Sequence, residues 1–91
     1  MKVCKFGGSS LAGAQQVAQA CDIVLADPDR RIVVVSAPGK RHADDRKVTD
    51  LLIACAEKRL AGETADAEYA AVVARYADIQ VGLGLGSGIT E

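Results

Sequence analysis

The sequence is poor in aromatic residues and has no long apolar run. It contains no tryptophan, one phenylalanine and two tyrosines among 91 residues, so its core has to be built from alanine, valine, leucine and isoleucine. No apolar stretch approaches the ~20 residues that a membrane-spanning helix needs. No charged segment followed by an apolar stretch indicates a signal peptide. The net charge is −1 and the basic residues form no large block. These absences argue against a membrane protein and a nucleic-acid partner, and favour a cytoplasmic protein.

Cysteine and histidine are scarce as well. The three cysteines, Cys4, Cys21 and Cys55, are widely spaced in apolar surroundings, and the one histidine, His42, stands among charged residues. An odd number of separated cysteines is typical of buried thiols rather than of a disulfide framework, and this agrees with a cytoplasmic location. Metal-binding cysteines and histidines usually lie closer together in sequence. The sequence therefore predicts no metal site of this kind.

The hydrophobic pattern predicts strands that alternate with helices. Residues 2–6 and 32–35 are typical of strands, and the second run, Ile-Val-Val-Val, is continuous as in a strand covered on both faces. Between them, apolar residues recur every three or four positions from 11 to 25, which predicts an amphipathic helix that ends near Pro28. Two further helices are expected, over about 48–60 and, from a weaker pattern, over 66–77.

The order of these elements predicts a three-layer α/β/α fold with a mostly parallel sheet. Strand, helix, strand is a βαβ unit, whose crossover is right-handed. Two short strands leave the edges and much of the faces of a sheet uncovered. We therefore expect residues 1–91 to form the N-terminal part of a larger domain, in the order β-α-β-α-α. The glycine-rich residues 82–91 are expected to be a flexible tail.

The stretch KFGGSS, residues 5–10, joins the first strand to the first helix. A loop in this position directs backbone N–H groups outward, and the helix N-terminus after it favours an anion. Two glycines let the backbone approach a phosphate oxygen without a Cβ in the way. Lys5 would add an ammonium group, and Ser9 or Ser10 would cap the helix or donate to the ligand. A tight turn without a ligand explains the same residues, so this stretch alone leaves both interpretations open.

A second polar group follows the second strand. Residues 36–40 (Ser-Ala-Pro-Gly-Lys) lie at its carboxyl end, and Thr49 lies at the start of the next predicted helix. Ligands of open parallel sheets bind outside the carboxyl ends of the strands, so these hydroxyls are expected on the same rim as Gly7 and Gly8. Thr49 or Asp50 could instead serve only as a helix cap. Neither a Walker A loop nor a G-x-G-x-x-G fingerprint is present.

The motif KFGGSS closely resembles the K-F-G-G-[ST]-S opening of aspartate kinases, in the amino acid kinase superfamily. The resemblance continues through VVVSA at 33–37 and the PGKR loop to KVTDLL at 47–52, with matching order and spacing from residue 1 to about 60. It implies an amino acid kinase-like fold and ATP-dependent phosphorylation of the β-carboxylate of L-aspartate to 4-phospho-L-aspartate, the first step toward lysine, threonine and methionine. Mg²⁺ is expected to accompany ATP.

The resemblance also implies roles for individual residues. Lys5 would be the catalytic residue that stabilises the transferred phosphoryl group. The nucleotide-binding residues would be Lys5, Phe6, Gly7, Gly8 and Ser9. The residues that bind L-aspartate would be Ser36, Ala37 and Thr49. Ser9 replaces the threonine that is more usual at its position and retains the hydroxyl.

The 91 residues contain none of the family's later elements, which are an aspartate-binding glutamate, an Arg/Asp loop, the nucleotide pocket and the regulatory domains. We therefore expect the isolated chain to be inactive and to need the remainder of the kinase domain; the resemblance leaves a homo-oligomer open. Two alternatives remain. One is another carboxylate or phosphate kinase of the same superfamily. The other is a non-catalytic fragment that folds on docking to a missing chain through its exposed sheet edges.

Overall fold

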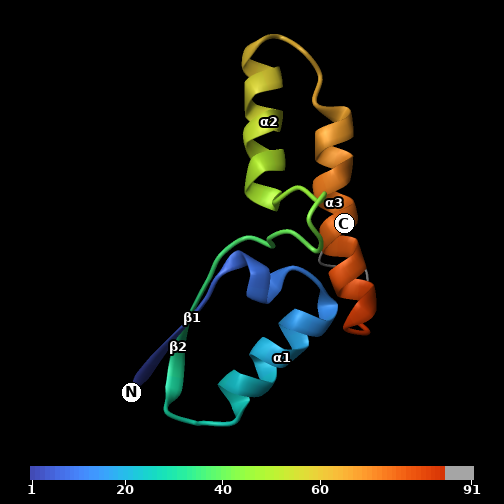
Figure 1. Ribbon diagram of the computed structural model, residues 1–91. Coiled ribbons are helices and arrows are strands. Elements are labelled where there is room, and N and C mark those ends of the chain that lie inside the picture. Colours follow the sequence, from blue (N-terminus) through green and yellow to red (C-terminus); the bar gives the residue numbers. More distant parts are fainter. Residues whose placement is uncertain (86–91) are drawn as a thin grey trace.

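The computed structural model describes residues 1–85; residues 86–91, in the predicted tail, lie outside the described residues. Its elements are β1 (Lys2–Phe6), the 3₁₀ turn η1 (Gly8–Leu11), α1 (Ala14–Leu25), β2 (Arg30–Val35), α2 (Val48–Leu60) and α3 (Asp66–Gly82). Both predicted strands and all three predicted helices are therefore present (Figure 1). Within residues 1–85 no helix combines the length and the apolar character needed to cross a membrane.

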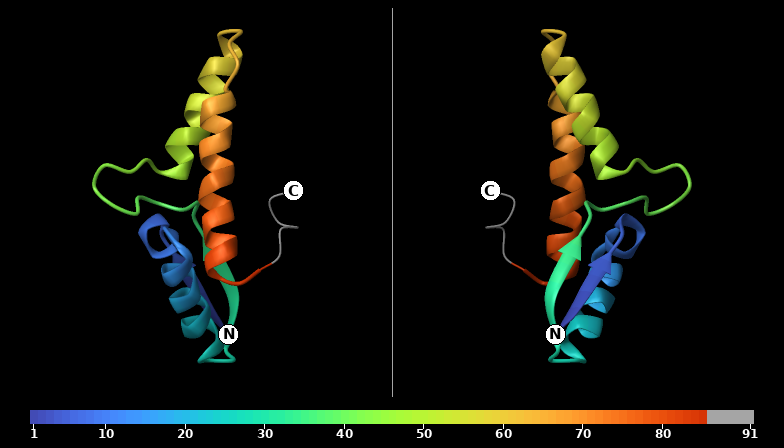
Figure 2. Two further views of the ribbon diagram at one scale, coloured as in Figure 1. Left: turned by 90° about the vertical axis from the view of Figure 1, so that its right-hand side faces the viewer. Right: turned by 90° about the vertical axis from the view of Figure 1, so that its left-hand side faces the viewer.

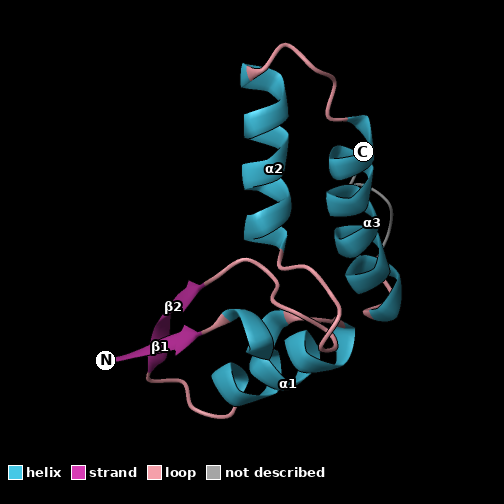
Figure 3. Ribbon diagram, turned by 45° about the horizontal axis from the view of Figure 1, so that its top comes forward, coloured by secondary structure: helices cyan, strands magenta, loops and turns pink. Residues whose placement is uncertain are grey.

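The strands β1 and β2 form a two-stranded parallel sheet in which Lys5 pairs with Val34 and Phe6 with Val35. Because the strands are parallel, both carboxyl ends lie at the same edge of the sheet, and the chain leaves this edge toward η1 and α2 (Figure 3). The predicted α/β arrangement with a parallel sheet is confirmed.

A small core lies between the sheet and α1. Side chains alternate between the two faces of a strand, so Cys4 and Phe6 point to the same face. The stripe of apolar residues on α1 covers part of that face. The buried members of the core are Phe6, Leu11 and Ala20, and the half-buried side chains packed against them are Cys4, Val17 and Val24. The apolar pattern over residues 11–25 thus predicted Leu11, Val17 and Val24 on the core side, but Ala20 lies outside that pattern and Leu25, at its end, is 81% exposed.

The strand β2 is exposed, contrary to the expectation that it is covered on both faces. Ile32 and Val34, on the face opposite α1, are 43% and 47% exposed, and Val35, on the α1 face, is 61% exposed. Within residues 1–85, α1 packs against one face of the sheet and covers only part of it. A continuous β-branched run is typical of a buried strand, but no element within residues 1–85 buries β2.

The helices α2 and α3 form a helical hairpin that projects away from the sheet (Figures 1 and 2). Val48 and Leu51, on the inner face of α2, are buried. An ion pair joins the helices near the tip, where Lys58 Nζ lies 2.6 Å from Glu68 Oε1. The hairpin makes the molecule elongated: its radius of gyration is 15.0 Å, against about 12 Å for a compact domain of this length.

The helix α3 continues to Gly82, five residues beyond the predicted end at residue 77. It ends because Gly84 has a φ of +73°, which lets its N–H donate to the Val81 carbonyl while the Leu85 N–H donates to the Gln80 carbonyl, each over 3.0 Å. This is the hydrogen-bond pattern of a glycine helix stop. The weak apolar pattern of this segment ended at residue 77, so the sequence did not predict residues 78–82 as helix.

The helix α1 also differs from the prediction at its start. Ser9 and Ser10 lie inside η1, and α1 begins at Ala14 after Gly13, with no side-chain hydrogen bond at that end. The expectation that a serine caps this helix is wrong. The chain first makes the tight η1 turn at the strand exit, and the extended backbone of Gly13 then separates this turn from α1.

Candidate functional site

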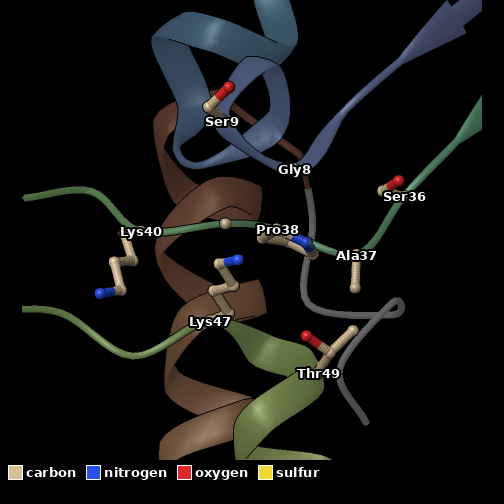
Figure 4. Close-up of a pocket in the computed structure, with 9 residues that line it drawn as sticks. Gly8, Ser9, Ser36, Ala37, Pro38, Lys40, Lys47 and Thr49 are labelled. Carbon is tan, nitrogen blue, oxygen red and sulfur yellow. The ribbon is translucent and has the colours of Figure 1, made fainter.

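A pocket of about 480 Å³ lies at the carboxyl edge of the sheet. Three segments form it: η1, the loop after β2 and the first turn of α2 (Figure 4). The lining residues are Gly8, Ser9, Ser36, Ala37, Pro38, Gly39, Lys40, Lys47 and Thr49. Segments that are far apart in sequence thus meet outside the ends of parallel strands, where ligands of such sheets bind.

Backbone contacts hold these three segments together. The Gly39 N–H donates to the Gly8 carbonyl over 2.8 Å, and the Val48 N–H donates to the Pro38 carbonyl over 3.0 Å. The first contact depends on glycine, since a Cβ on Gly39 would lie 2.7 Å from the carbonyl carbon of Gly8. The loop after β2 is therefore held against η1 on one side and against α2 on the other.

Arg75 of α3 holds the same segments with its side chain, and it is only 3% exposed. Its Nη1 donates to the Arg46 carbonyl over 2.8 Å, and its Nη2 donates to the carbonyls of Ala12, over 3.0 Å, and Gly39, over 2.5 Å. No motif in the sequence indicated a role for this residue. The available signal was an arginine within the apolar stretch AAVVARYA, residues 70–77.

The lining of the pocket carries ammonium and hydroxyl groups and no carboxylate. Figure 4 shows the Thr49 hydroxyl pointing toward Lys47, whereas the Ser9 hydroxyl points away from Pro38. Within residues 1–85 the N–H groups of Thr49 and Asp50, in the first turn of α2, donate to no acceptor. Cationic side chains and free N–H groups at a helix N-terminus favour an anionic ligand.

An ion pair organises the loop between Lys40 and Lys47. Arg41 Nε lies 2.7 Å from Asp45 Oδ2, Arg41 Nη2 lies 3.1 Å from Oδ1, and the Arg41 backbone N–H also donates to Oδ2. These hydrogen bonds hold the pKa of Asp45 well below its usual range and raise the pKa of Arg41. Asp45 Oδ2 also lies 3.5 Å from Arg75 Nη1, so the loop is connected to α3 through charge as well.

Five of the predicted site residues line the pocket: Gly8, Ser9, Ser36, Ala37 and Thr49. The expectation that residues from both strand ends and from the start of the second helix share one rim is therefore confirmed in geometry. Their roles in binding stay predictions.

The other three predicted site residues do not line the pocket. Lys5 is exposed on β1, and strand alternation places its side chain on the sheet face opposite Phe6. Gly7 precedes η1, and its carbonyl accepts from the Ser10 N–H. The Phe6 side chain belongs to the core, and its contact with the rim is through its carbonyl, which accepts from the Ser36 N–H over 3.1 Å.

Thr49 is a lining residue rather than a helix cap. The residue that precedes α2 is Lys47, and this end has no side-chain cap hydrogen bond. The alternative in which Thr49 or Asp50 serves only as the cap is therefore wrong. Val48 is the first helical residue, and its N–H donates to the Pro38 carbonyl of the loop. The Thr49 side chain lines the pocket.

The residues present do not fit a magnesium site. Mg²⁺ in proteins is held through carboxylates and waters, and the pocket lining contains no carboxylate. In the part of the chain that the structure describes, no group of three His, Cys, Asp or Glu residues could hold a metal ion. The chemistry available in this pocket is that of ammonium, hydroxyl and backbone N–H groups.

The sequence is similar to those of known aspartokinases, although no protein-family model matches it. It is 58% identical over 91 residues to Aspartokinase 3 of Bacillus subtilis (strain 168). The aligned region is 100% of this chain and 20% of that protein. A Haemophilus influenzae protein whose name calls it an inactive aspartokinase 3 is 41% identical over 56 residues, 62% of this chain and 40% of that protein. The chain thus spans about a fifth of the length of the Bacillus relative.

Two solved structures are similar as well. The aspartate kinase of Clostridium acetobutylicum superposes with a TM-score of 0.88 at 38% identity, over 92% of this chain and 19% of that chain. Aspartokinase III of E. coli, in complex with aspartate and ADP, superposes with a TM-score of 0.58 at 32% identity, over 89% of this chain and 15% of that chain.

Proposed function

The chain is homologous to the N-terminal portion of aspartate kinases, and from this premise we propose that the protein it belongs to transfers a phosphoryl group from ATP to L-aspartate. An oxygen of the β-carboxylate forms a new bond to the γ-phosphorus as the bond to the leaving oxygen of ADP breaks. The products are ADP and 4-phospho-L-aspartate, a precursor for lysine, threonine and methionine. Such a transfer depends on positioning and on cationic and N–H donors around the phosphoryl group.

One observation carries this proposal: the pocket gathers Gly8, Ser36, Lys47 and Thr49 from three separate segments and excludes carboxylates. Both substrates are anionic, and acidic side chains in the lining would repel them. The ammonium groups, the hydroxyls and the free N–H groups of the first turn of α2 all favour anions instead.

The proposal assigns the two ends of the pocket to the two substrates. The aspartate side is formed by Ser36, Ala37 and Thr49, which follow β2 and begin α2. The nucleotide side is the segment from Lys5 to Ser9, of which Gly8 and Ser9 line the pocket. In this proposal the amides of Gly7 and Gly8 bind the phosphates, and Lys5 reaches the transferred group from outside the lining. Lys5 is exposed, so its ammonium is free to extend from the strand toward a bound phosphate.

We propose that residues 1–91 are inactive alone, because they span 20% of the Bacillus relative and leave β2 exposed on both faces. The test compares the purified chain with a chimeric kinase, in which residues 1–91 replace the matching segment of Bacillus subtilis Aspartokinase 3. Hydroxylamine traps acyl phosphates as hydroxamates that can be assayed. We expect product from the chimeric kinase with aspartate, and none from the chain. Product with glutamate or carbamate in place of aspartate would instead support another kinase of the superfamily.

A second candidate, a non-catalytic segment that docks to another chain, is favoured by the exposed apolar residues of the sheet. Val3, Ile32 and Val34 are 63%, 43% and 47% exposed on its open face, and such a face invites pairing or packing with further chain. Circular dichroism of the purified chain separates the cases. A cooperative melt counts against folding on docking, whereas a weak and non-cooperative signal supports it.

The thiols agree with the proposed setting of this enzyme. Cys4, Cys21 and Cys55 are free in the structure, but Cys21 is exposed and the other two are half-buried, so the expectation of buried thiols is wrong. Free thiols are typical of proteins in reducing compartments. We propose a cytoplasmic location, where ATP and free amino acids are available.

A further inference from the structure

Arg75 lies behind the loop that forms one wall of the pocket and does not face the pocket itself. It does not line the pocket between η1 and α2; it lines a separate cavity of about 350 Å³, together with Arg41, Asp45 and Asp78. Gly39 therefore lies between the pocket, which it lines, and the buried guanidinium, which donates to its carbonyl oxygen.

This position has a consequence for the backbone N–H groups. In a trans peptide the C=O and the N–H point in opposite directions, and the described residues contain no cis peptide. Since Arg75 holds the carbonyls of Gly39 and Arg46, the N–H groups of Lys40 and Lys47 point away from it. Lys40 and Lys47 both line the pocket, and within residues 1–85 neither N–H donates to an acceptor.

We propose that Arg75 is a positioning residue that holds the Lys40 and Lys47 amides as hydrogen-bond donors for a carboxylate of the amino-acid substrate. The inference rests on the proposed function, and adjacent Ser36 and Thr49 identify this part of the pocket as the aspartate side. Arg75 contacts no substrate itself. It acts by fixing two peptide units in the orientation that an anion needs, so the donors do not have to be ordered when the ligand binds.

An arginine suits this task for a geometric reason. Three carbonyls, from Ala12, Gly39 and Arg46, are held by two nitrogens of one planar group. A lysine ammonium is a single point that cannot reproduce the fixed spread of the guanidinium fork. The carboxylate of Asp45 lies 3.5 Å from Arg75 Nη1, so the buried guanidinium is paired as well as hydrogen-bonded.

The experiment uses the chimeric kinase with three variants: Arg75→Met, Arg75→Lys and the control Arg59→Met. Arg59 is exposed on α2 and makes no side-chain hydrogen bond or ion pair within residues 1–85. Steady-state kinetics give KM for aspartate, KM for ATP and kcat. Hydrogen–deuterium exchange by mass spectrometry compares peptides that cover residues 36–48 with peptides from the centres of α1 and α2.

We expect Arg75→Met to raise KM for aspartate about tenfold or more, as for lost hydrogen bonds to a charged group, with KM for ATP and kcat changed less than about threefold. Exchange in residues 36–48 should accelerate while the helix centres stay unchanged. Arg75→Lys should resemble Arg75→Met, and Arg59→Met should resemble the parent. If Arg75→Met does not fold, the lysine variant decides alone.

Three results would overturn the inference. They are unchanged kinetics and exchange in Arg75→Met, full retention of function by Arg75→Lys, and a uniform rise in exchange across all helices, which indicates a general structural role. An inactive parent chimera would contradict the proposed function instead. In that case the exchange comparison still decides whether Arg75 orders the loop.

Discussion

The backbone of Gly39 lies directly against that of Gly8, with the Gly39 N–H 2.8 Å from the Gly8 carbonyl oxygen. This contact joins the chain leaving β1 to the chain leaving β2, and so it brings the two halves of the pocket together. It exists because neither residue has a side chain between the two backbones.

The first prediction follows from this contact. A Cβ at residue 39 would lie 2.7 Å from the Gly8 carbonyl carbon and 2.9 Å from the Ser9 nitrogen, so Gly39→Ala should separate the loops and destabilise the fold by about 1–3 kcal/mol. Hydrogen–deuterium exchange of residues 36–40 in the chimeric kinase should increase. Gly7→Ala is the matched control, since a Cβ there meets no atom within 4 Å. Equal exchange in both variants would show that the contact is not needed.

A second prediction concerns the end of α3. Gly84 has a φ of +73°, which costs a residue with a Cβ roughly 1–2 kcal/mol. Gly84→Ala should therefore fray the last turn of α3, and Gly84→Asn should do so less, because asparagine tolerates this conformation better. Exchange of the peptide that contains Gln80 and Val81 measures the fraying. Identical behaviour of the two variants would argue that this helix stop is unimportant.

The third prediction concerns acid. Hydrogen bonds from Arg41 hold the pKa of Asp45 well below its usual range, so the folded state binds this proton more weakly than the unfolded state. The resulting stability is fully present above the unfolded pKa of about 3.9, and it is lost as pH falls through the folded value. Asp45→Asn should lower the unfolding temperature of the chimeric kinase at neutral pH, and the difference from the parent should shrink below about pH 4.

Asp44→Asn is the control for this measurement. Asp44 is the neighbouring carboxylate, it is exposed, and within residues 1–85 it forms no side-chain hydrogen bond or ion pair. Its unfolding temperature should follow that of the parent across the range. A constant difference between Asp45→Asn and the parent at every pH would mean that the Arg41 pairing does not stabilise the fold through charge.

A fourth prediction tests the proposed role of Lys5. Lys5→Ala in the chimeric kinase should lower kcat about 10²-fold or more, since a donor to the transferred group is lost, while KM for aspartate changes little. Lys2→Ala removes a lysine from the same strand, where it pairs with Asp27 over 2.6 Å, and should leave kcat nearly unchanged. Loss of activity through aspartate affinity alone would mean that Lys5 does not act on the phosphoryl group.

The fifth prediction concerns Thr49, whose hydroxyl faces the pocket (Figure 4). Thr49→Ala should raise KM for aspartate about tenfold, as expected for a lost hydrogen bond to a charged group, with little effect on KM for ATP. Thr49→Ser keeps the hydroxyl and should retain most of the affinity. Equal effects on both substrates would assign Thr49 to the structure of the α2 end instead.

Much of the local structure followed from sequence pattern. The 3.6-residue period predicted α1 and α2, because burial of one helix face leaves a periodic mark on the sequence. The continuous β-branched run predicted β2 through the strand preference of valine and isoleucine. The helix ends were predicted less well: α1 begins at Ala14 without a serine cap, and α3 continues to Gly82. Helix ends depend on neighbours in space, such as Ala14, against which Gly82 packs.

The motifs KFGGSS and KVTDLL determined, on their own, which family the chain resembles and which strand ends would form a site, because parallel strands place their carboxyl ends at one edge. Only the tertiary structure revealed that Arg75, 36 residues beyond Gly39, holds that site from behind. Sequence patterns report periodic burial. The hydrogen bonds of a buried guanidinium to three backbone carbonyls depend instead on a chain path that brings distant segments together. Every residue has a backbone carbonyl, so the sequence gives no sign of which carbonyls will be bound.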